Sequence, residues 1–123
     1  MNQGFPKASR LLKRKEFRLV YETGTPYRNA GFHLFVLRRE AETPEAREPS
    51  RIGLTATRRL GGAVVRNRAR RRAREAYRAW RGRVAPGCDL VLNFHGRMAD
   101  ASHGTFDRLF QDVLEKAHLL EPE

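Results

Sequence analysis

The sequence predicts a single α+β domain over residues 1–123, with helices packed on a small sheet. The chain has the length of one compact domain. Three segments carry apolar residues at helical spacing, and three short segments are rich in β-branched and aromatic residues. They follow one another in the order helix, strand, strand, helix, strand, helix, without an internal repeat. This order is typical of an α+β domain.

The first helix is expected over residues 11–23. Its apolar residues recur at roughly helical spacing, and Gly24 is a natural stop after the last turn. Residues 1–10 are polar and include Pro6, so they are expected to form a loosely ordered arm. The apolar residues of the helix are Leu12, Phe17, Val20 and Tyr21.

Two strands are expected on either side of an acidic loop. Residues 31–38 and 51–57 are rich in branched and aromatic side chains, and we expect them to be partner strands. Residues 40–50 hold four of the 14 acids and two of the six prolines, which predicts a solvated loop. Alternation along the strands puts His33, Phe35 and Leu37 on one face, Leu34 and Val36 on the other, and Ile52, Leu54 and Ala56 toward the core.

The C-terminal half is expected to form a helix, a strand and a second helix. Residues 63–80 follow a Gly-Gly turn, and residues 89–94 are a short apolar run typical of a buried strand. Residues 102–120 form an amphipathic pattern that Ser102 or Thr105 would cap. The apolar stripe of the first of these helices consists of Val65, Ala69, Ala73, Ala76 and Trp80.

The charge balance predicts a polyanionic partner. The chain has 25 Lys+Arg and 14 Asp+Glu, a net charge of +11 and a pI of about 11.1. Of the 25 cations, 21 are Arg, whose planar fork of donors fits phosphate oxygens and stacks on bases. Cys88 is the single cysteine, so the sequence offers no intramolecular disulfide. It has no secretory signal and no long apolar stretch, and we expect a cytoplasmic protein without membrane contact.

The strongest local pattern is a basic cluster on the predicted helix over residues 63–80. Between Arg58 and Arg83 there are 11 arginines and one acid, Glu75. Like charges four residues apart destabilise a helix by about 0.2–0.5 kcal/mol per pair, and a polyanion along that face reverses the effect. A merely solvated face usually mixes signs, so we interpret this one as a nucleic-acid-binding surface. The helical arginines are Arg66, Arg70, Arg74 and Arg78 on one face, widened by Arg68, Arg71 and Arg72.

The helix N-terminus and the aromatic residues add two further hypotheses. Arg66, Asn67 and Arg68 lie near an N-terminus whose amides favour a phosphate. Phe17 and Tyr21 are four residues apart, and with Phe35 they form either part of the core or an open platform for an unpaired strand. The four histidines have no metal-ligand spacing, and no nucleophile–base pair is visible. We therefore expect no catalytic residue, metal or cofactor in the protein itself.

Two blocks of the sequence resemble the bacterial ribonuclease P protein family. Residues 51–75 read R-I-G-L-T-A-T-R-R-L-G-G-A-V-V-R-N-R-A-R-R-R-A-R-E, similar to the family's strand, Gly-containing turn and basic helix. Residues 10–24 fit R-L-x-x-x-x-E-F-x-x-V-Y-x-x-G, which resembles its first helix. The resemblance implies a fold like the second domain of ribosomal protein S5, an α/β sandwich with a mixed sheet and a left-handed β-α-β crossover.

The resemblance also implies a function and a set of site residues. The protein would bind the catalytic RNA of ribonuclease P and the 5′ leader of precursor tRNA, and would assist cleavage by an RNA centre that requires Mg²⁺. No obligate protein partner is implied. Where the family often has Ala-Arg, this chain has Phe94-His95, so a contact made by that Arg is in doubt here. By position, the surface for the catalytic RNA would be Arg58, Arg59, Arg66, Asn67, Arg68, Arg70, Arg71 and Arg74, and the leader cleft Phe17, Tyr21, His33 and Phe35.

Three alternatives are less consistent with these patterns. A structural rRNA-binding protein of ribosomal type shares the charge but gives no reason for an aromatic cleft. A DNA-binding regulator would need a helix-turn-helix partner and more varied polar side chains for base readout. A protein-only nuclease would need a carboxylate constellation, and the sequence offers none.

Overall fold

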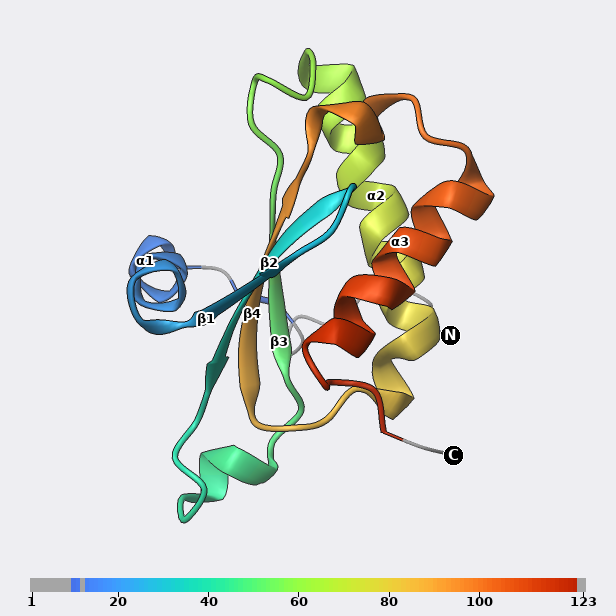
Figure 1. Ribbon diagram of the computed structural model, residues 1–123. Coiled ribbons are helices and arrows are strands. Elements are labelled where there is room, and N and C mark those ends of the chain that lie inside the picture. The colour runs from blue at the N-terminus through green and yellow to red at the C-terminus, as the bar shows by residue number, and fades with distance from the viewer. Residues whose placement is uncertain (1–9, 12, 122–123) are drawn as a thin grey trace, which may run out of the picture.

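The computed structural model describes residues 10–11 and 13–121 and confirms an α+β fold (Figure 1). Residues 1–9 of the expected arm, and Leu12, lie outside the described residues. The last arm residue, Arg10, forms a parallel bridge with Ile52, and the Leu11 amide donates to the Ile52 carbonyl at 3.1 Å. The elements are α1 (Arg14–Thr23), β1 (Thr25–Arg28), β2 (Phe32–Arg38), η2 (Pro44–Arg47), β3 (Arg51–Thr55), α2 (Ala63–Trp80), η3 (Arg81–Arg83), β4 (Cys88–Phe94), η4 (Gly96–Ala99) and α3 (His103–Lys116).

The four strands form one mixed sheet in the order β1-β2-β4-β3. β4 pairs antiparallel with β2 and parallel with β3. The expectation that the strands at 31–38 and 51–57 are partners is therefore wrong, because β4 lies between them. β1, which sequence analysis did not identify, pairs antiparallel with β2 at the sheet edge. Its sequence Thr-Pro-Tyr-Arg is short and mostly exposed, so it lacks the apolar alternation of a buried strand.

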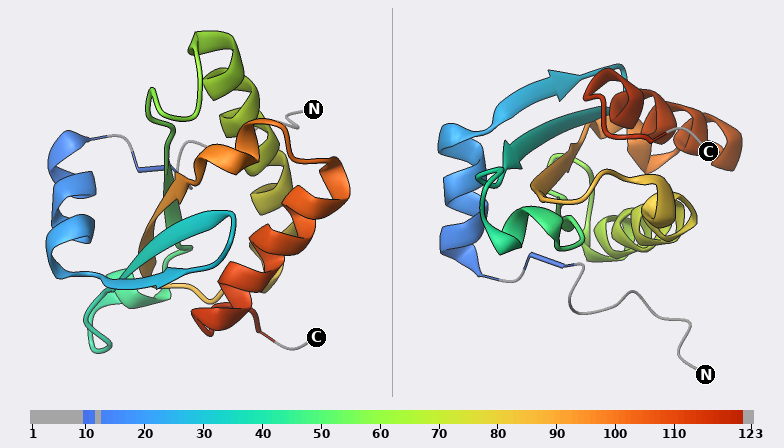
Figure 2. Two further views of the ribbon diagram at one scale, coloured as in Figure 1. Left: turned by 45° about the horizontal axis from the view of Figure 1, so that its top comes forward. Right: turned by 90° about the horizontal axis from the view of Figure 1, so that it is seen from below.

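The two faces of the sheet are covered by different helices, α2 and α3 on one side and α1 on the other (Figures 1 and 2). The main core lies under α2 and α3 and includes Phe32, Leu34 and Val36, while a smaller cluster under α1 centres on Val20 and Val91. The alternation predicted for β2 is confirmed: Leu34 and Val36 are buried, whereas His33, Phe35 and Leu37 face the α1 side and are only partly covered.

α2 has the bounds that its sequence predicts, but its buried face differs in one residue. Ala69 and Ala73 are buried as expected, and Val65, Ala76 and Trp80 pack against the core from its margin. Tyr77 was not predicted in the stripe and is fully buried. Its hydroxyl donates to the Ser50 carbonyl at 3.4 Å, and burial raises its pKa. Tyr77 lies four residues after Ala73, so the same helical period places it inward.

α2 connects the parallel strands β3 and β4, so the expected β-α-β crossover is present. Its left-handed sense stays a prediction from the resemblance. The loop over residues 40–50 is largely exposed and contains the short helix η2. The last helix begins as predicted, with the Ser102 hydroxyl accepting from the Thr105 amide at 3.2 Å.

Candidate nucleic-acid interface

The outward face of α2 presents cationic side chains around a shallow surface hollow. Arg68 and Arg71 are exposed, and they line this hollow with Val64, Asn67 and Arg74. Val64 is 75% exposed, which adds an apolar contact in the middle of the charges. We call the face formed by these residues the α2 face; it is the central part of the surface that the sequence predicts for nucleic acid.

Asn67 has a local role on this face. Its Oδ1 accepts a hydrogen bond from Nη2 of Arg70 at 2.6 Å. The bond fixes one guanidinium one turn along the helix, which lowers the entropy lost when that group binds a ligand. Asn67 therefore has a structural role on this face, because it orients the Arg70 guanidinium.

Arg72 departs from the expected basic band. Its Nη1 donates to the Ala101 carbonyl at 2.8 Å, and its guanidinium carbon lies 4.4 Å from the centre of the Phe106 ring. The first contact ties α2 to the chain that leads into α3, and the second ties it to α3 itself. Arg72 is consequently part of the helix–helix contact rather than of the α2 face.

The turn before α2 brings more positive charge to its N-terminus. Arg58 and Arg59 are exposed in the turn that follows β3, as the sequence predicts for the edge of the basic surface. Gly62 is the N-cap and provides no side-chain cap, and the first turn holds no acid. The amides of this turn and its positive helix end are thus suited to an anion.

On the other side of the sheet, three of the four predicted cleft residues come together. The Tyr21 and Phe35 rings meet edge to face with centroids 4.9 Å apart, and the His33 ring lies 4.3 Å from Phe35. The Tyr21 hydroxyl donates to Asn93 Oδ1 at 2.7 Å and lies 3.2 Å from Thr55 Oγ1. These bonds hold the Tyr21 ring against the sheet. Phe35 and Tyr21 are each partly exposed, so they are both packed and accessible.

Phe17 lies apart from this group, one turn earlier on α1. It packs over Gly53 of β3 and lines a small hollow with Leu11, Arg10 and Arg74. We call this the Arg74 hollow. Burial lowers the pKa of Arg74, and the charges of Arg10 and Arg70 lower it further. Arg74 lines both this hollow and the hollow of the α2 face, so positive charge continues from the α2 face to the aromatic side of the sheet.

A third hollow lies at the end of the sheet where β2 begins and β4 ends. We call it the histidine hollow; its polar lining residues include Arg28, His33, Thr57, Arg59, Asn93 and His95. Burial lowers the pKa of His33, and the charge of Arg28 on the neighbouring strand lowers it further.

Several residues of these sites had no signal in the sequence. Arg10 and Arg28 stand outside the basic cluster, and Asn93 lies inside an apolar run. Their positions follow from strand pairing, because the register sets His33 opposite both Arg28 and Asn93. Asn93 is found only when β4 is placed next to β2, Arg28 only when β1 is recognised beside β2, and Arg10 only from its bridge to Ile52.

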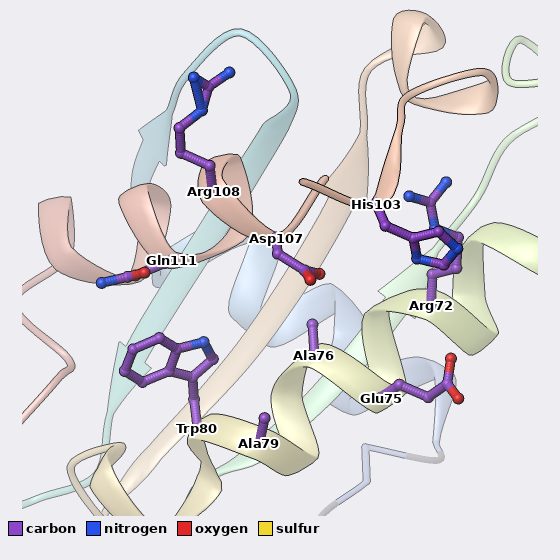
Figure 3. Close-up of a pocket in the computed structure, with 9 residues that line it drawn as sticks. All are labelled: Arg72, Glu75, Ala76, Ala79, Trp80, His103, Asp107, Arg108 and Gln111. Atoms are coloured by element: carbon purple, nitrogen blue, oxygen red, sulfur yellow. The ribbon is translucent and has the colours of Figure 1, made fainter. Parts of the chain in front are cut away.

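The groove between α2 and α3 has a different character (Figure 3). Trp80 and Glu75 of α2 line it opposite Asp107 of α3. Figure 3 shows Asp107 pointing across toward α2, while Arg108 points away. Its two acids are matched by Arg72 and Arg108, so this groove lacks the excess of cations that defines the basic surface.

Two further features concern the described residues as a whole. They contain no group of three or more His, Cys, Asp or Glu residues able to hold a metal ion. No helix among them is both long and apolar enough to cross a membrane.

Comparisons with known proteins identify one family. The family model described as "Ribonuclease P" matches residues 5–118. The ribonuclease P protein component of Shouchella clausii is 33% identical over 116 residues, covering 94% of this chain and 91% of that protein. The one from Symbiobacterium thermophilum is 38% identical over 117 residues, covering 95% and 97%.

Solved structures share the fold. The Staphylococcus aureus RNase P protein superposes with a TM-score of 0.81 at 23% identity, over 94% of this chain and 100% of that one. The Thermotoga maritima RNase P protein does so with a TM-score of 0.75 at 23% identity, over 87% and 96%. With the family match over nearly the whole chain and relatives above 30% identity, these findings establish that the chain belongs to the bacterial ribonuclease P protein family.

Proposed function

We propose that this chain is the protein subunit of ribonuclease P and contacts two RNAs at once. The α2 face, with Arg66, Arg58 and Arg59 at its margin, binds the catalytic RNA. Tyr21, Phe35 and Phe17 bind the single-stranded 5′ leader of precursor tRNA. The observation that carries the proposal is the Arg74 hollow, where an arginine of α2 and an aromatic ring of α1 line the same depression.

The division of labour follows from the chemistry of the two surfaces. Arginine forks neutralise phosphates of a folded RNA without reading its sequence. Partly exposed rings accept unpaired bases by stacking, which every base allows. The protein thereby lowers the repulsion between two polyanions and holds the leader extended.

Cleavage itself belongs to the RNA in this proposal. Mg²⁺ ions bound by the catalytic RNA stabilise the attacking and leaving oxygens, and the protein supplies no metal ligand. The role of the chain is then to position the substrate and to reduce the amount of Mg²⁺ needed to screen the charges.

The deciding experiment is precursor-tRNA cleavage by the catalytic RNA at low Mg²⁺, with and without the chain. We expect the chain to restore cleavage at the mature 5′ end, and rigorously RNA-free chain to cleave nothing. Cleavage by the protein alone, or no effect on the catalytic RNA, would contradict the proposal.

A second arm tests the leader surface. Replacing Tyr21 or Phe35 with Ala should weaken binding of leader-bearing tRNA by about 1–3 kcal/mol where bases stack, and leave assembly with the catalytic RNA intact. Mature tRNA, which has no leader, is the control. Because both rings also pack on the small core, the variants must first unfold at denaturant concentrations close to the parent's. Unchanged discrimination between the two tRNAs by folded variants would refute the leader assignment.

A further inference from the structure

The groove between α2 and α3 is formed by two matching rows of side chains, each with a spacing of four residues. The rows are Arg72, Ala76 and Trp80 on α2, and His103, Asp107 and Gln111 on α3. Residues four apart share one face of a helix, so each row faces the groove. Figure 3 shows the two rows running in the same order, and the contacts of Arg72 with Ala101 and Phe106 fix this alignment at the start of α3.

The first pair across the groove, Arg72 and His103, supplies positive charge and donors. Arg72 Nη1 donates to the Ala101 carbonyl, whereas its buried Nε and Nη2 have no hydrogen-bond partner in the part of the chain that the structure describes. Buried donors of this kind cost free energy until an acceptor satisfies them. The exposed His103 imidazole carries an N–H in either protonation state. This end of the groove therefore suits one anionic group of oxygens.

The middle of the groove holds a carboxylate opposite a small residue. Asp107 points across toward α2, where the short side chain of Ala76 leaves room in front of it (Figure 3). Within the described residues, the Asp107 carboxylate makes no hydrogen bond or ion pair with another side chain. The other acid of the lining, Glu75, belongs to neither row. A carboxylate in this position can accept from hydroxyl groups, as acidic residues do from ribose in dinucleotide-binding folds.

The last pair, Trp80 and Gln111, offers a ring surface and an acceptor. Arg83 covers one face of the partly exposed Trp80 ring, with its guanidinium carbon 5.1 Å from the ring centre, and leaves the other face for a ligand. The Gln111 Nε2 donates to Glu115 Oε2 at 3.3 Å, so the Gln111 Oε1 remains to accept from a ligand amino group. A flat base with an exocyclic amino group fits this end.

We propose that this groove binds a purine ribonucleoside monophosphate unit, with the phosphate at Arg72 and His103, the ribose at Asp107 and the base on Trp80. The helix rises about 12 Å from Arg72 to Trp80, which is comparable with the length of an extended nucleotide. The volume of the groove is about 540 Å³, and ligand pockets typically have about 300–1,000 Å³. The site is separate from the proposed surfaces for the catalytic RNA and the leader.

The first test uses Trp80 as a local probe. Trp80 is the only tryptophan in the sequence, so its fluorescence in the full chain reports on this groove and not on the arginines elsewhere. AMP should change the fluorescence in a saturable manner. The 2′-deoxy form of AMP lacks one hydroxyl that Asp107 would bind, and its affinity should be about tenfold lower. Adenosine, which has no phosphate, should also bind more weakly. No response to AMP, or equal affinities for AMP and its 2′-deoxy form, would overturn the proposal.

The second test assigns the ribose to Asp107. The Asp107 side chain is exposed, so Asp107→Ala should fold as the parent does. Removing an acid raises the affinity for any anion, and the informative quantity is therefore the ratio of affinities for AMP and 2′-deoxy-AMP. This ratio should fall from about ten to about one in Asp107→Ala. The matched control Asp100→Ala removes the same charge outside the groove lining and should keep the parent's ratio. A ratio that Asp107→Ala leaves unchanged would overturn the proposal.

A third variant fills the groove without changing its charge. Ala79 is exposed and lines the groove beside Trp80, so Ala79→Leu should occupy the space of the base and leave the chain folded. AMP binding, followed by NMR shifts of α3 amides, should weaken about tenfold or more. AMP binding as tight as in the parent would count against the groove as the site.

A short single-stranded oligoribonucleotide identifies the source of the nucleotide unit. If AMP changes Trp80 fluorescence and the oligoribonucleotide does not, the ligand is a free nucleotide. If the oligoribonucleotide also changes it, and Asp107→Ala abolishes its preference over the matching oligodeoxyribonucleotide, the site also accepts a nucleotide within RNA. Either result supports the site. A response to the oligoribonucleotide alone, unchanged in Asp107→Ala, would overturn it.

Discussion

At the scale of single residues, one glycine determines how closely α1 approaches the sheet. A Cβ on Gly53 would lie 2.4 Å from two ring carbons of Phe17, nearer than nonbonded atoms can approach. Gly53 is buried in β3 opposite Val91, so the ring lies directly on the strand backbone. The position of Phe17, and of the Arg74 hollow that it lines, depends on this missing side chain.

Gly53→Ala should therefore destabilise the protein by about 1–3 kcal/mol, the usual cost of overpacking. The added Cβ would also lie 3.2 Å from Leu11 Cβ, so the Phe17 ring must move away from the strand. Urea denaturation measures the change. Gly104→Ala in α3, where an added Cβ meets nothing within 4 Å, is the control and should be neutral or stabilising. A Gly53→Ala protein as stable as the parent would contradict the account.

At the scale of elements, α2 uses one residue type for two purposes. Arg71 is exposed on the α2 face, whereas its neighbour Arg72 is bonded to Ala101 and stacked on Phe106. Neighbouring residues on a helix point about 100° apart, so a run of arginines necessarily reaches both solvent and the adjoining helix.

The pair Arg71→Ala and Arg72→Ala should separate these purposes. Arg72→Ala removes a hydrogen bond and a cation–π contact and should lower the free energy of unfolding by about 1–3 kcal/mol. Arg71→Ala should leave that free energy within about 0.5 kcal/mol of the parent and weaken assembly with the catalytic RNA. Denaturation and RNA titration of both variants check this. Similar losses of stability in both would show that the assignment of the two side chains is wrong.

Ion pairs fasten α1 to the sheet at the end away from the histidine hollow. Arg51 of β3 binds Glu16 of α1 at 2.9 Å and Asp89 of β4 at 3.0 Å, and Asp89 also binds Arg39 at 2.8 Å. Burial of Asp89 acts to raise its pKa, but the hydrogen bonds and charges of Arg51 and Arg39 outweigh burial, and the pKa lies below its ordinary value.

This shift predicts how stability depends on pH. Because the pKa of Asp89 is lower in the folded chain, its contribution is fully present above the unfolded value of about 3.9 and is lost as the pH falls through the folded value. The free energy of unfolding, measured with denaturant, should thus fall between neutral pH and pH 3. The fall should be smaller in Asp89→Asn, since the variant has no carboxylate charge to lose. The surface carboxylate variant Glu42→Gln should keep the parent's dependence. If Asp89→Asn lost as much unfolding free energy at low pH as the parent, the stabilising role of these ion pairs would be refuted.

Sequence patterns predicted the helices well and the sheet incompletely. α2 has the predicted limits and α3 the predicted start, because turns or caps set them locally. The end of α3 was predicted wrongly: the helix stops at Lys116 and not at residue 120, and His118 adopts a positive φ of 57°. The order of strands depends on contacts between distant residues: β4 enters between β2 and β3 although it follows both in the chain. The sequence identified the aromatic residues of the candidate site, but it did not predict their contacts or how exposed their rings are. The position of the Tyr21 ring depends on its hydrogen bond to Asn93, 72 residues away. The ring is packed and also partly exposed, so the core and the platform interpretations each hold in part.

At the scale of the whole molecule, positive charge surrounds the sheet on several sides. The α2 face, the Arg74 hollow and the histidine hollow lie on different elements, yet each is lined by arginines. The net charge of +11 favours any polyanion, and the rings between the cationic sites mark the place where we propose that a single strand binds. Affinity should therefore come mainly from charge, and discrimination from the aromatic side.

This balance gives the last prediction, which concerns salt. Neutralising Z phosphates makes log affinity fall against log salt with a slope of about −0.9Z for duplexes and −0.7Z for single strands. Binding of the catalytic RNA should show the steeper dependence, because the α2 face presents its arginines to a folded RNA. The ratio of affinities for leader-bearing and mature tRNA should change less with salt, since stacking on Tyr21 and Phe35 releases no counterions. Titrations from low to moderate salt measure both. A nearly flat affinity for the catalytic RNA would refute the electrostatic account. A leader preference that falls as steeply as the affinity itself would mean that charge, and not the rings, distinguishes the substrate.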